Sequence, residues 1–209
     1  MMKLQDLTLK EFLEKTAGND ALPAGGSSAA FIAAIAAALT EMVANVTIGK
    51  KQYVIVEDRM REIATEMSAN RAYLVNSIDR DAVAYQQLID AYRLPKETDI
   101  EIDLRNKSIE DATKNACLVP MEMAERAYNL LDTMIETMQI GNKHATTDAL
   151  VGLIACRSAI LATLLNVRTN LGGIRDKTFV VEMQTKCDSM ERATLQKEVQ
   201  SIAWLKATL

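Results

Sequence analysis

Two aspartates flank an arginine at Asp79-Arg80-Asp81, inside a stretch whose apolar residues have helical spacing. Residues two apart on a helix point to different faces, so at least one of these carboxylates is expected to face inward. Burial would raise the pKa of that carboxyl group toward the range of a general acid. Asp79 and Asp81 are therefore candidates for acid–base catalysis, with a solvated helix surface as the alternative.

A second polar group lies further along the chain. Asp148 stands in the first turn of an expected helix whose next residues are apolar. Asn166 and Asn170 are four residues apart and share a face near the far end of that helix. Such a pair beside Arg168 is costly to bury without a ligand or a polar network. With Asn142, these residues are candidates for catalysis and binding; structural cross-linking is the alternative.

An anionic ligand could be held at either end of the alanine-rich run that follows segment 23–28. Glycines allow close approach of the backbone, and a helix N-terminus offers free N–H groups and a positive dipole end. Lysines at the other end could hold an anionic tail, or could only complement the helix dipole. The candidates are Gly25, Gly26, Ser27, Lys50 and Lys51.

Several other kinds of site are not indicated. The single histidine, His144, has no second His or Cys nearby, so a metal centre is not expected. The three cysteines are far apart and odd in number, which is typical of reduced thiols in a cytosolic protein. A formal net charge of -4 argues against a nucleic-acid partner. No phosphate-binding loop or nucleophile-elbow motif occurs.

These residues must be positioned by helices. Aromatic residues make up only 4% of the chain and strong helix formers are abundant, and no segment alternates convincingly with period two. The spacing predicts helices over 8–17, 26–49, 54–92, 98–138 with a kink at Pro120, 145–170 and 177–205. We expect a single all-α domain over 1–209, a bundle of long antiparallel helices, with a homodimer covering its longest members.

The alanine-rich run at 29–48 is long and apolar, which raises the question of a membrane. It follows about twenty polar or mixed residues, unlike a signal peptide, and it carries Glu41 and Asn45. A helix packed closely inside a protein is the favoured interpretation, and a membrane-associated helical protein is the alternative.

The order of several short motifs resembles one known family. They are Pro23-Ala24-Gly25-Gly26-Ser27-Ser28, Gly49-Lys50-Lys51-Gln52-Tyr53, Asp79-Arg80-Asp81-Ala82-Val83-Ala84-Tyr85, Arg93-Leu94-Pro95-Lys96, Val119-Pro120, Gly141-Asn142 with Thr147-Asp148, and Asn166-Val167-Arg168-Thr169-Asn170-Leu171. The chain resembles the cyclodeaminase-like domain of the formiminotransferase-cyclodeaminase and methenyltetrahydrofolate cyclohydrolase family. It departs from the family's P-x-P-G-G-G-S pattern at Ala21 and Ala24.

The resemblance implies an all-α homodimer that acts on a tetrahydrofolate derivative, without a metal or further cofactor. The implied reaction converts 5-formiminotetrahydrofolate to 5,10-methenyltetrahydrofolate and ammonia. Methenyltetrahydrofolate cyclohydrolase is the alternative activity, and a non-catalytic folate-binding scaffold is a further one. The expected setting is cytoplasmic histidine degradation beside a separate formiminotransferase, because the chain has no room for a transferase domain.

The implied reaction needs a base for the N10 proton and an acid for the departing amine. We assign these roles to Asp148 and to one of Asp79 and Asp81. The residues expected to hold the pterin and the glutamate tail, which is often polymeric, are Gly25, Gly26, Ser27, Lys50, Lys51, Asn142, Asn166, Arg168 and Asn170. An enzyme is expected to gather such residues around one cleft, whereas a scaffold has no reason to do so.

Overall fold

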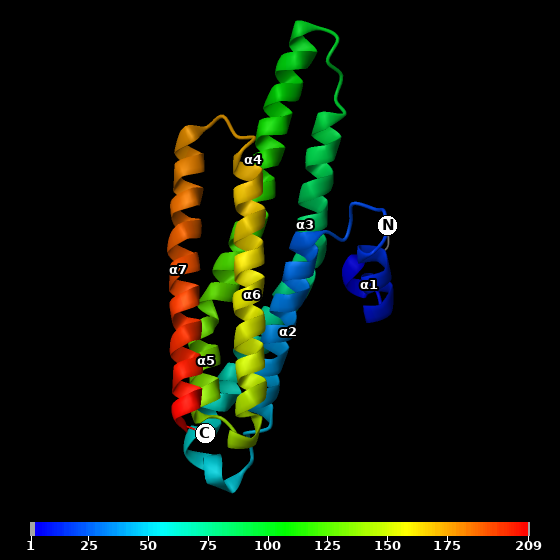
Figure 1. Cartoon of the computed structure of the whole chain (residues 1–209). Helices are drawn as coiled ribbons and strands as arrows, with labels where there is room; N and C mark the ends of the chain where they lie inside the picture. The colour runs from blue at the N-terminus through cyan, green and yellow to red at the C-terminus, as the bar shows by residue number, and fades with distance from the viewer. Residues whose placement is uncertain (1–2, 209) are drawn as a thin grey trace.

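The computed structural model describes residues 3–208, so the outermost residues of the predicted domain 1–209 lie outside it. This part of the chain is a bundle of long helices without strands, which confirms the predicted fold class (Figure 1). The elements are η1 Leu4–Asp6, α1 Leu9–Thr16, α2 Gly25–Asn45, η2 Lys51–Val56, α3 Glu57–Tyr92, α4 Asp99–Asn129, α5 Leu131–Ile140, η3 Lys143–Ala145, α6 Thr146–Leu171 and α7 Lys177–Thr208.

Helix α2 lies between α3 and α6, and alanine makes this close packing feasible. Ala30, Ala36 and Ala37 are fully buried along its length. A Cβ atom on Gly152 of α6 would lie only 3.3 Å from the carbonyl oxygen of Ala36. Small residues on both helices therefore let the backbones approach, as the alanine-rich run predicted.

Helices α1 and α4 each begin with a capping box, formed by Thr8 with Glu11 and by Thr98 with Glu101. Helix α1 packs beside α2, where the rings of Phe12 and Phe31 have centroids 5.4 Å apart. The pair α3 and α4 forms a long hairpin whose tip extends beyond the other helices (Figure 1). The predicted helices therefore exist, and the differences concern where they end.

The predicted helix 98–138 is divided in two, because α4 contains Pro120 and continues to Asn129, and α5 begins at Leu131. The break falls at Leu130, whose N–H bonds to the carbonyl of Ala127, three residues back, at 3.2 Å. Proline lacks the N–H that would bond to the carbonyl four residues earlier, that of Ala116. The side-chain nitrogen of Asn170 donates to this same carbonyl at 2.9 Å. The carbonyl of Ala116 therefore keeps a hydrogen-bond donor although the proline supplies none.

The second predicted helix is also shorter than expected. Helix α2 ends at Asn45 rather than at residue 49, and α3 begins at Glu57 after the separate 3-10 turn η2. The chain reverses direction through Gly49, which has φ +76° and so adopts a conformation that favours glycine. Ile55 of η2 is 95% exposed at this end of the bundle.

Two helices, α2 and α6, are long and apolar enough to cross a membrane by length and composition alone. In the fold, 56% of the apolar window of α2 and 44% of that of α6 are buried inside the protein. Helices of a protein core pass the same test. Both helices keep an apolar side that the rest of the chain leaves uncovered.

Candidate active site

The start of α2 meets the middle of α3 at one very close contact. The Asp81 carboxylate of α3 lies against Gly26, where a Cβ atom would be only 2.1 Å from Oδ1 of Asp81. No side chain larger than hydrogen fits at position 26 unless this carboxylate moves. The glycine predicted to admit a ligand therefore admits a carboxylate of the same chain.

Ser27 connects this carboxylate to the backbone. Its hydroxyl is buried and lies 3.0 Å from the carbonyl oxygen of Ile78 and 3.3 Å from Oδ2 of Asp81. Burial raises the pKa of the Asp81 carboxyl above its ordinary value, and hydrogen bonds from Ser27 act in the opposite direction. Asp81 is thus the inward-facing member of the predicted pair.

The serine hydroxyl can serve both protonation states of Asp81. When the carboxyl is protonated it can donate to Ser27 Oγ, and the serine proton is then free for the carbonyl of Ile78. When the carboxylate is ionised, it competes with that carbonyl for the serine proton. The geometry therefore suits a group that holds and releases a proton.

Asn166 of α6 completes this end of the site. A Cβ atom on Gly25 would lie 4.0 Å from Oδ1 of Asn166, so the amide stands beside the exposed start of α2. The first N–H groups of a helix have no acceptor within the helix. Gly25, Gly26, Ser27, Asp81 and Asn166 are brought together from three helices, as expected for a binding site.

Asp79 has a different environment. Its carboxylate accepts hydrogen bonds from the backbone N–H groups of Leu4 at 2.7 Å and Gln5 at 3.3 Å. It therefore fastens the N-terminal segment to α3. Of the two aspartates predicted as alternatives, the structure places only Asp81 against the start of α2.

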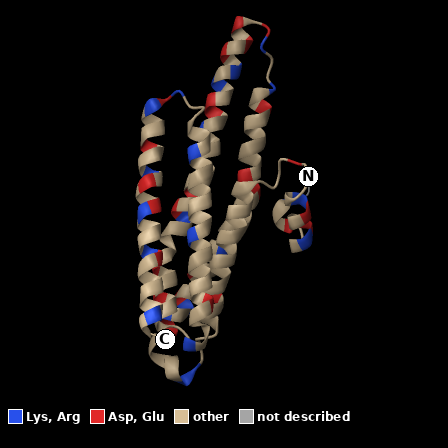
Figure 2. Cartoon of the chain, viewed as in Figure 1, with Lys and Arg blue, Asp and Glu red and all other residues tan. Residues whose placement is uncertain are grey.

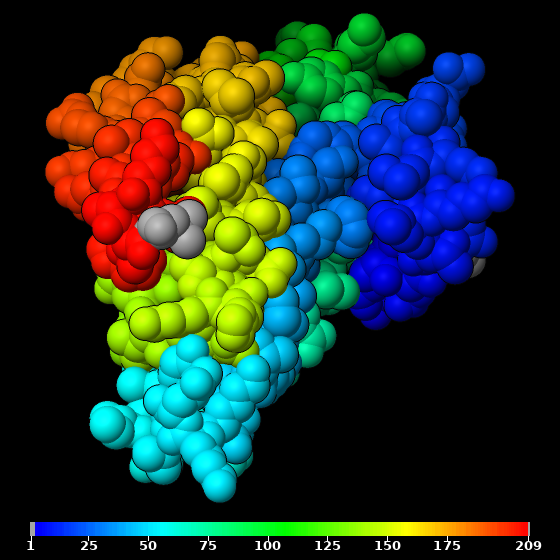
Figure 3. Space-filling model, turned by 60° about the horizontal axis from the view of Figure 1, so that its bottom comes forward, coloured from blue at the N-terminus to red at the C-terminus, as the bar shows by residue number. Residues whose placement is uncertain are grey.

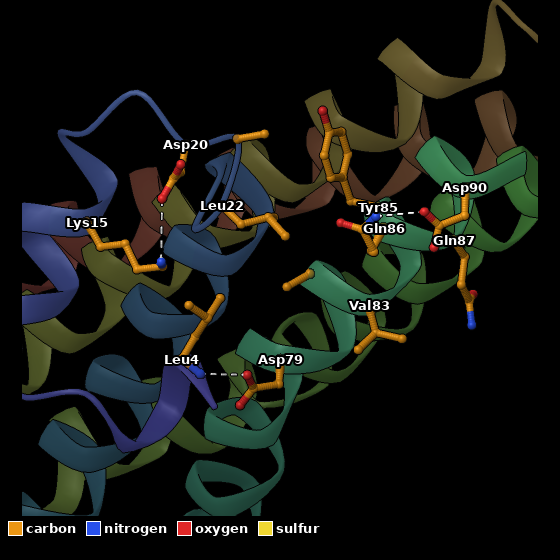
Figure 4. Close-up of a pocket in the computed structure, with 12 residues that line it drawn as sticks. Leu4, Lys15, Asp20, Leu22, Asp79, Val83, Tyr85, Gln86, Gln87 and Asp90 are labelled. Carbon is orange, nitrogen blue, oxygen red and sulfur yellow. Dashed lines mark hydrogen bonds and ion pairs between the residues drawn. The ribbon is translucent and has the colours of Figure 1, made fainter. Parts of the chain in front are cut away.

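A cleft of about 570 Å³ lies beside this region, between the N-terminal segment and α3 (Figure 4). In the close-up, Leu4 and Leu22 form one wall, and Val83 and Gln86 lie on the other. Asp81 is not among its lining residues, although Ala82 is. This cleft was not predicted from the sequence, because its lining includes Lys15 and Asp20, whose charges alone indicate only an exposed surface. The lining residues are Leu4, Lys15, Asp20, Ala21, Leu22, Asp79, Ala82, Val83, Tyr85, Gln86, Gln87 and Asp90.

Four predicted site residues lie at the opposite end of α2. Asn142 is buried there, and its side chain donates to the carbonyl of Val46 at 3.1 Å and accepts from the N–H of His144 at 3.1 Å. Lys50 and Lys51 are exposed, and Asp148 is partly exposed. With 21 residues, α2 is about 30 Å long, so these residues are far from Asp81 within one chain.

Arg168 and Asn170 are engaged in contacts between helices. Arg168 pairs with Asp188 at 2.8 Å and Glu191 at 2.5 Å, both on α7. The amide of Asn170 bonds to α4 as described above. The expectation that all the polar candidates surround one cleft is therefore wrong for the single chain. Among residues 3–208, no group of three or more His, Cys, Asp or Glu is placed to hold a metal ion.

Comparisons with known proteins agree on one family. A family model described as formiminotransferase-cyclodeaminase matches residues 8–189. The chain is 31% identical to formimidoyltransferase-cyclodeaminase of Rattus norvegicus over 187 residues, which is 90% of this chain but only 35% of that protein. It is 34% identical to methenyltetrahydrofolate cyclohydrolase of Methylorubrum extorquens over 175 residues, 84% of each chain.

A solved structure is also similar over nearly its full length. Formiminotetrahydrofolate cyclodeaminase from Thermotoga maritima superimposes with a TM-score of 0.88 at 28% identity, covering 99% of both chains. The family match and the fold therefore agree.

Proposed function

Because the chain belongs to the formiminotransferase-cyclodeaminase family, we propose that it is a folate enzyme that converts 5-formiminotetrahydrofolate to 5,10-methenyltetrahydrofolate and ammonia. The observation that carries this proposal is Asp81, a carboxyl group whose pKa burial raises and which Gly26 accommodates at the start of α2. The names of the relatives describe reactions at the one-carbon unit of tetrahydrofolate. Such reactions require proton transfer, which a carboxyl group like that of Asp81 can provide.

The reaction makes one C–N bond and breaks another. N10 of the folate attacks the formimino carbon to give a tetrahedral intermediate. The exocyclic nitrogen takes up two protons, the one that N10 loses and one from an acid, and leaves as ammonia, so that a methenyl cation results. We assign to Asp81 the role of this acid, because burial keeps its carboxyl protonated at higher pH than usual.

The same group would also favour the product. After donating its proton Asp81 is a carboxylate, and a carboxylate close to the methenyl carbon stabilises positive charge there. Ser27 holds the carboxyl in place, and the backbone N–H of Gly25 and the amide of Asn166 are the binding groups beside it.

Methenyltetrahydrofolate cyclohydrolase is the second candidate activity. The relative with this name matches 84% of its own length, which is a specific reason to keep it. In that reaction water attacks the same methenyl carbon and gives 10-formyltetrahydrofolate. An acid–base group at Asp81 suits both reactions, so the substrate given to the protein must decide.

The proposal has further parts that the sequence resemblance suggested. We propose a cytoplasmic homodimer that uses folates with a polymeric glutamate tail and works beside a separate formiminotransferase. The uncovered apolar side of α2 and α6 supports dimer formation, since a helix that is apolar all round is normally covered.

The test is an absorbance assay of the purified protein with each folate in turn. A rise of the methenyl band from 5-formiminotetrahydrofolate, with release of ammonia, is expected for the cyclodeaminase. Loss of that band from 5,10-methenyltetrahydrofolate, faster than in buffer and without ammonia release from the first substrate, would identify the cyclohydrolase. Neither change, with folded protein confirmed, would remove both.

Asp81→Asn should lower kcat/KM by about 100-fold or more, the usual contribution of a general acid. The matched control is Asp79→Asn on the same helix, which alters the anchor of the N-terminal segment and should keep most of the turnover. Near wild-type turnover of folded Asp81→Asn would remove this residue from the mechanism.

A further inference from the structure

Three consecutive residues of α3 face three different elements at the level of the candidate site. Asp79 binds the N-terminal segment, Asp81 lies against the start of α2, and Arg80 between them points to α4. Successive residues of an α-helix are about 100° apart around its axis, so neighbours in the chain can leave the helix in separate directions. Arg80 is the member of this triplet that the candidate site leaves unexplained.

The Arg80 guanidinium is held on the α4 side by several contacts. Its Nη2 donates to Oε2 of Glu122 at 2.5 Å, and its Nη1 donates to the hydroxyl of Tyr73 at 2.7 Å. The guanidinium carbon also lies 5.5 Å from the centre of the Tyr73 ring, and that of Arg126 lies 4.8 Å from the same ring. A charge-assisted hydrogen bond combined with an aromatic contact fixes a long side chain in one direction.

The groups that surround Asp81 on the neighbouring helices of residues 3–208 carry no charge. On α2 they are Gly26 and Ser27, and the one charged residue of that helix is Glu41, near its other end. Figure 2 accordingly shows α2 without charge over most of its length. On α6 the residue at this level is Asn166. The surroundings of the Asp81 carboxyl on these two helices are therefore polar at most.

The N-terminal side places its charges in the neighbouring cleft. Figure 3 shows the N-terminal segment packed against one side of α2, where Phe12 contacts Phe31. Lys15 pairs with Asp20 at 3.7 Å, so this lysine has its own counter-charge. The remaining ionisable groups on this side are exposed or lie in the wall of the cleft; they are Lys3, Asp6, Tyr85 and Asp90.

An uncompensated cation beside Asp81 would oppose its use as an acid. A positive charge close to a carboxyl group favours the ionised form and lowers its pKa. In a protein, a unit charge about 8 Å away shifts a pKa by on the order of one pH unit. Arg80 adjoins Asp81 in the chain, and Glu122 brings a negative charge within 2.5 Å of its guanidinium. Seen from Asp81, this ion pair is therefore nearly neutral.

We propose that Glu122 of α4 is a positioning residue for the active-site acid: it holds Arg80 on the α4 side and neutralises its charge, so that Asp81 keeps its proton without a cationic neighbour. Glu122 acts on Asp81 only through Arg80. The triplet of α3 then has three separate tasks, since Asp79 anchors the N-terminal segment and Arg80 connects the acid to α4. The consequence for turnover rests on the proposed function, whereas the effect on the titration of Asp81 does not.

Carbon-13 NMR of protein labelled at the aspartate carboxyl carbons tests the proposal without any folate. The Asp81 signal is assigned by its loss in Asp81→Asn. Glu122→Gln keeps an acceptor for Arg80 and removes only the charge, so the pKa of Asp81 should fall by on the order of one pH unit. Arg80→Met leaves the carboxylate of Glu122 and removes the cation, so this pKa should rise instead. The double variant should lie between the two single variants, because both charges are gone.

A second ion pair on the same helix is the matched control. Arg71 of α3 pairs with Glu41 of α2 at 2.7 Å, and it lies about 15 Å along the helix from Asp81. Glu41→Gln removes the same charge as Glu122→Gln and should leave the titration of Asp81 as in wild type. Both variants should stay folded, because partly exposed ion pairs contribute little to stability. An unchanged or raised pKa of Asp81 in Glu122→Gln, or the same fall in Glu41→Gln, would overturn the proposal.

The folate assay measures the consequence for catalysis. Turnover that depends on a protonated acid falls as the pH rises through the pKa of that acid. In Glu122→Gln this fall should begin about one pH unit lower, so turnover should be about 10-fold below wild type at alkaline pH and unchanged on the acidic plateau. Equal loss at every pH would show that Glu122 has only a structural role.

The two measurements separate this proposal from the proposed function. A wild-type protein that is inactive on both folates, but whose Asp81 signal shifts as expected in the variants, would remove the proposed function and keep the role of Glu122. An active wild-type protein in which Asp81 titrates independently of Glu122 would do the opposite.

Discussion

At the scale of single residues, the site depends on a glycine and a carboxylate that share one space. The pattern Asp79-Arg80-Asp81 predicted that one aspartate would face inward with a raised pKa, and Asp81 confirms this. It could not say which of the two, because that depends on the rotation of α3 against α2. Nor could it show that the backbone N–H groups of Leu4 and Gln5 would donate hydrogen bonds to the Asp79 carboxylate.

The glycines offer a matched pair of substitutions. Gly26→Ala places a methyl group on Asp81 and should cost about 1–3 kcal/mol of stability and most of the activity, because the carboxylate must move. Gly25→Ala should be nearly neutral for stability, since its Cβ would meet Asn166 only at 4.0 Å. Urea denaturation and the folate assay of both variants check this; equal effects would contradict the contact.

The raised pKa of Asp81 also predicts how stability changes with pH. The folded protein holds this proton more tightly than the unfolded chain, so the contribution is present at low pH and is lost as pH rises through the folded pKa. Asp81→Asn imitates the protonated form. Its Tm should match wild type near pH 4 and exceed it at pH 7 to 8. A Tm difference that is constant with pH would show that the pKa is not raised.

At the scale of elements, helix positions followed from composition and spacing, whereas the breaks depended on tertiary contacts. Pro120 does not interrupt α4 because Asn170, fifty residues further on, supplies a donor for the carbonyl that the proline leaves free. Nothing near Pro120 in the sequence reveals this donor. The same bond explains Asn170, which the sequence analysis assigned to the substrate.

A double-mutant cycle tests this exchange. Asn170→Ala should cost about 1–3 kcal/mol, because the carbonyl of Ala116 then loses its donor. In a Pro120→Ala background the restored N–H can bond to that carbonyl, so the cost of Asn170→Ala should fall by about 1 kcal/mol. Additive effects in urea denaturation would show that the two residues act independently.

At the scale of the whole molecule, the composition and the alanine-rich run were sufficient to predict a helical bundle. They could not show that the polar candidates would separate to two ends of α2. The order of motifs along a chain has no information about whether distant groups meet within that chain or across a symmetry axis. The split between Asp81 and Lys51 became visible only when α2 and α6 were placed side by side.

The apolar face of α6 predicts how the proposed dimer responds to an added charge. Leu165 of α6 is 61% exposed. Leu165→Glu places a carboxylate in that face and should convert the proposed dimer to monomer in light scattering after gel filtration. Val181→Glu on α7 is the control, because this valine is 63% exposed but lies on another helix. Both variants should stay folded by circular dichroism. A dimeric Leu165→Glu protein would place the interface elsewhere.

The contact between Gly26 and Asp81 has a consequence for reading other genomes. Because the two positions compete for one space, a chain that loses the carboxylate no longer needs the glycine, and a chain that replaces the glycine must first displace the carboxylate. The two positions should therefore change together during divergence. A relative with a larger residue at the position of Gly26 is therefore expected to have lost this catalytic activity, even where every helix is kept.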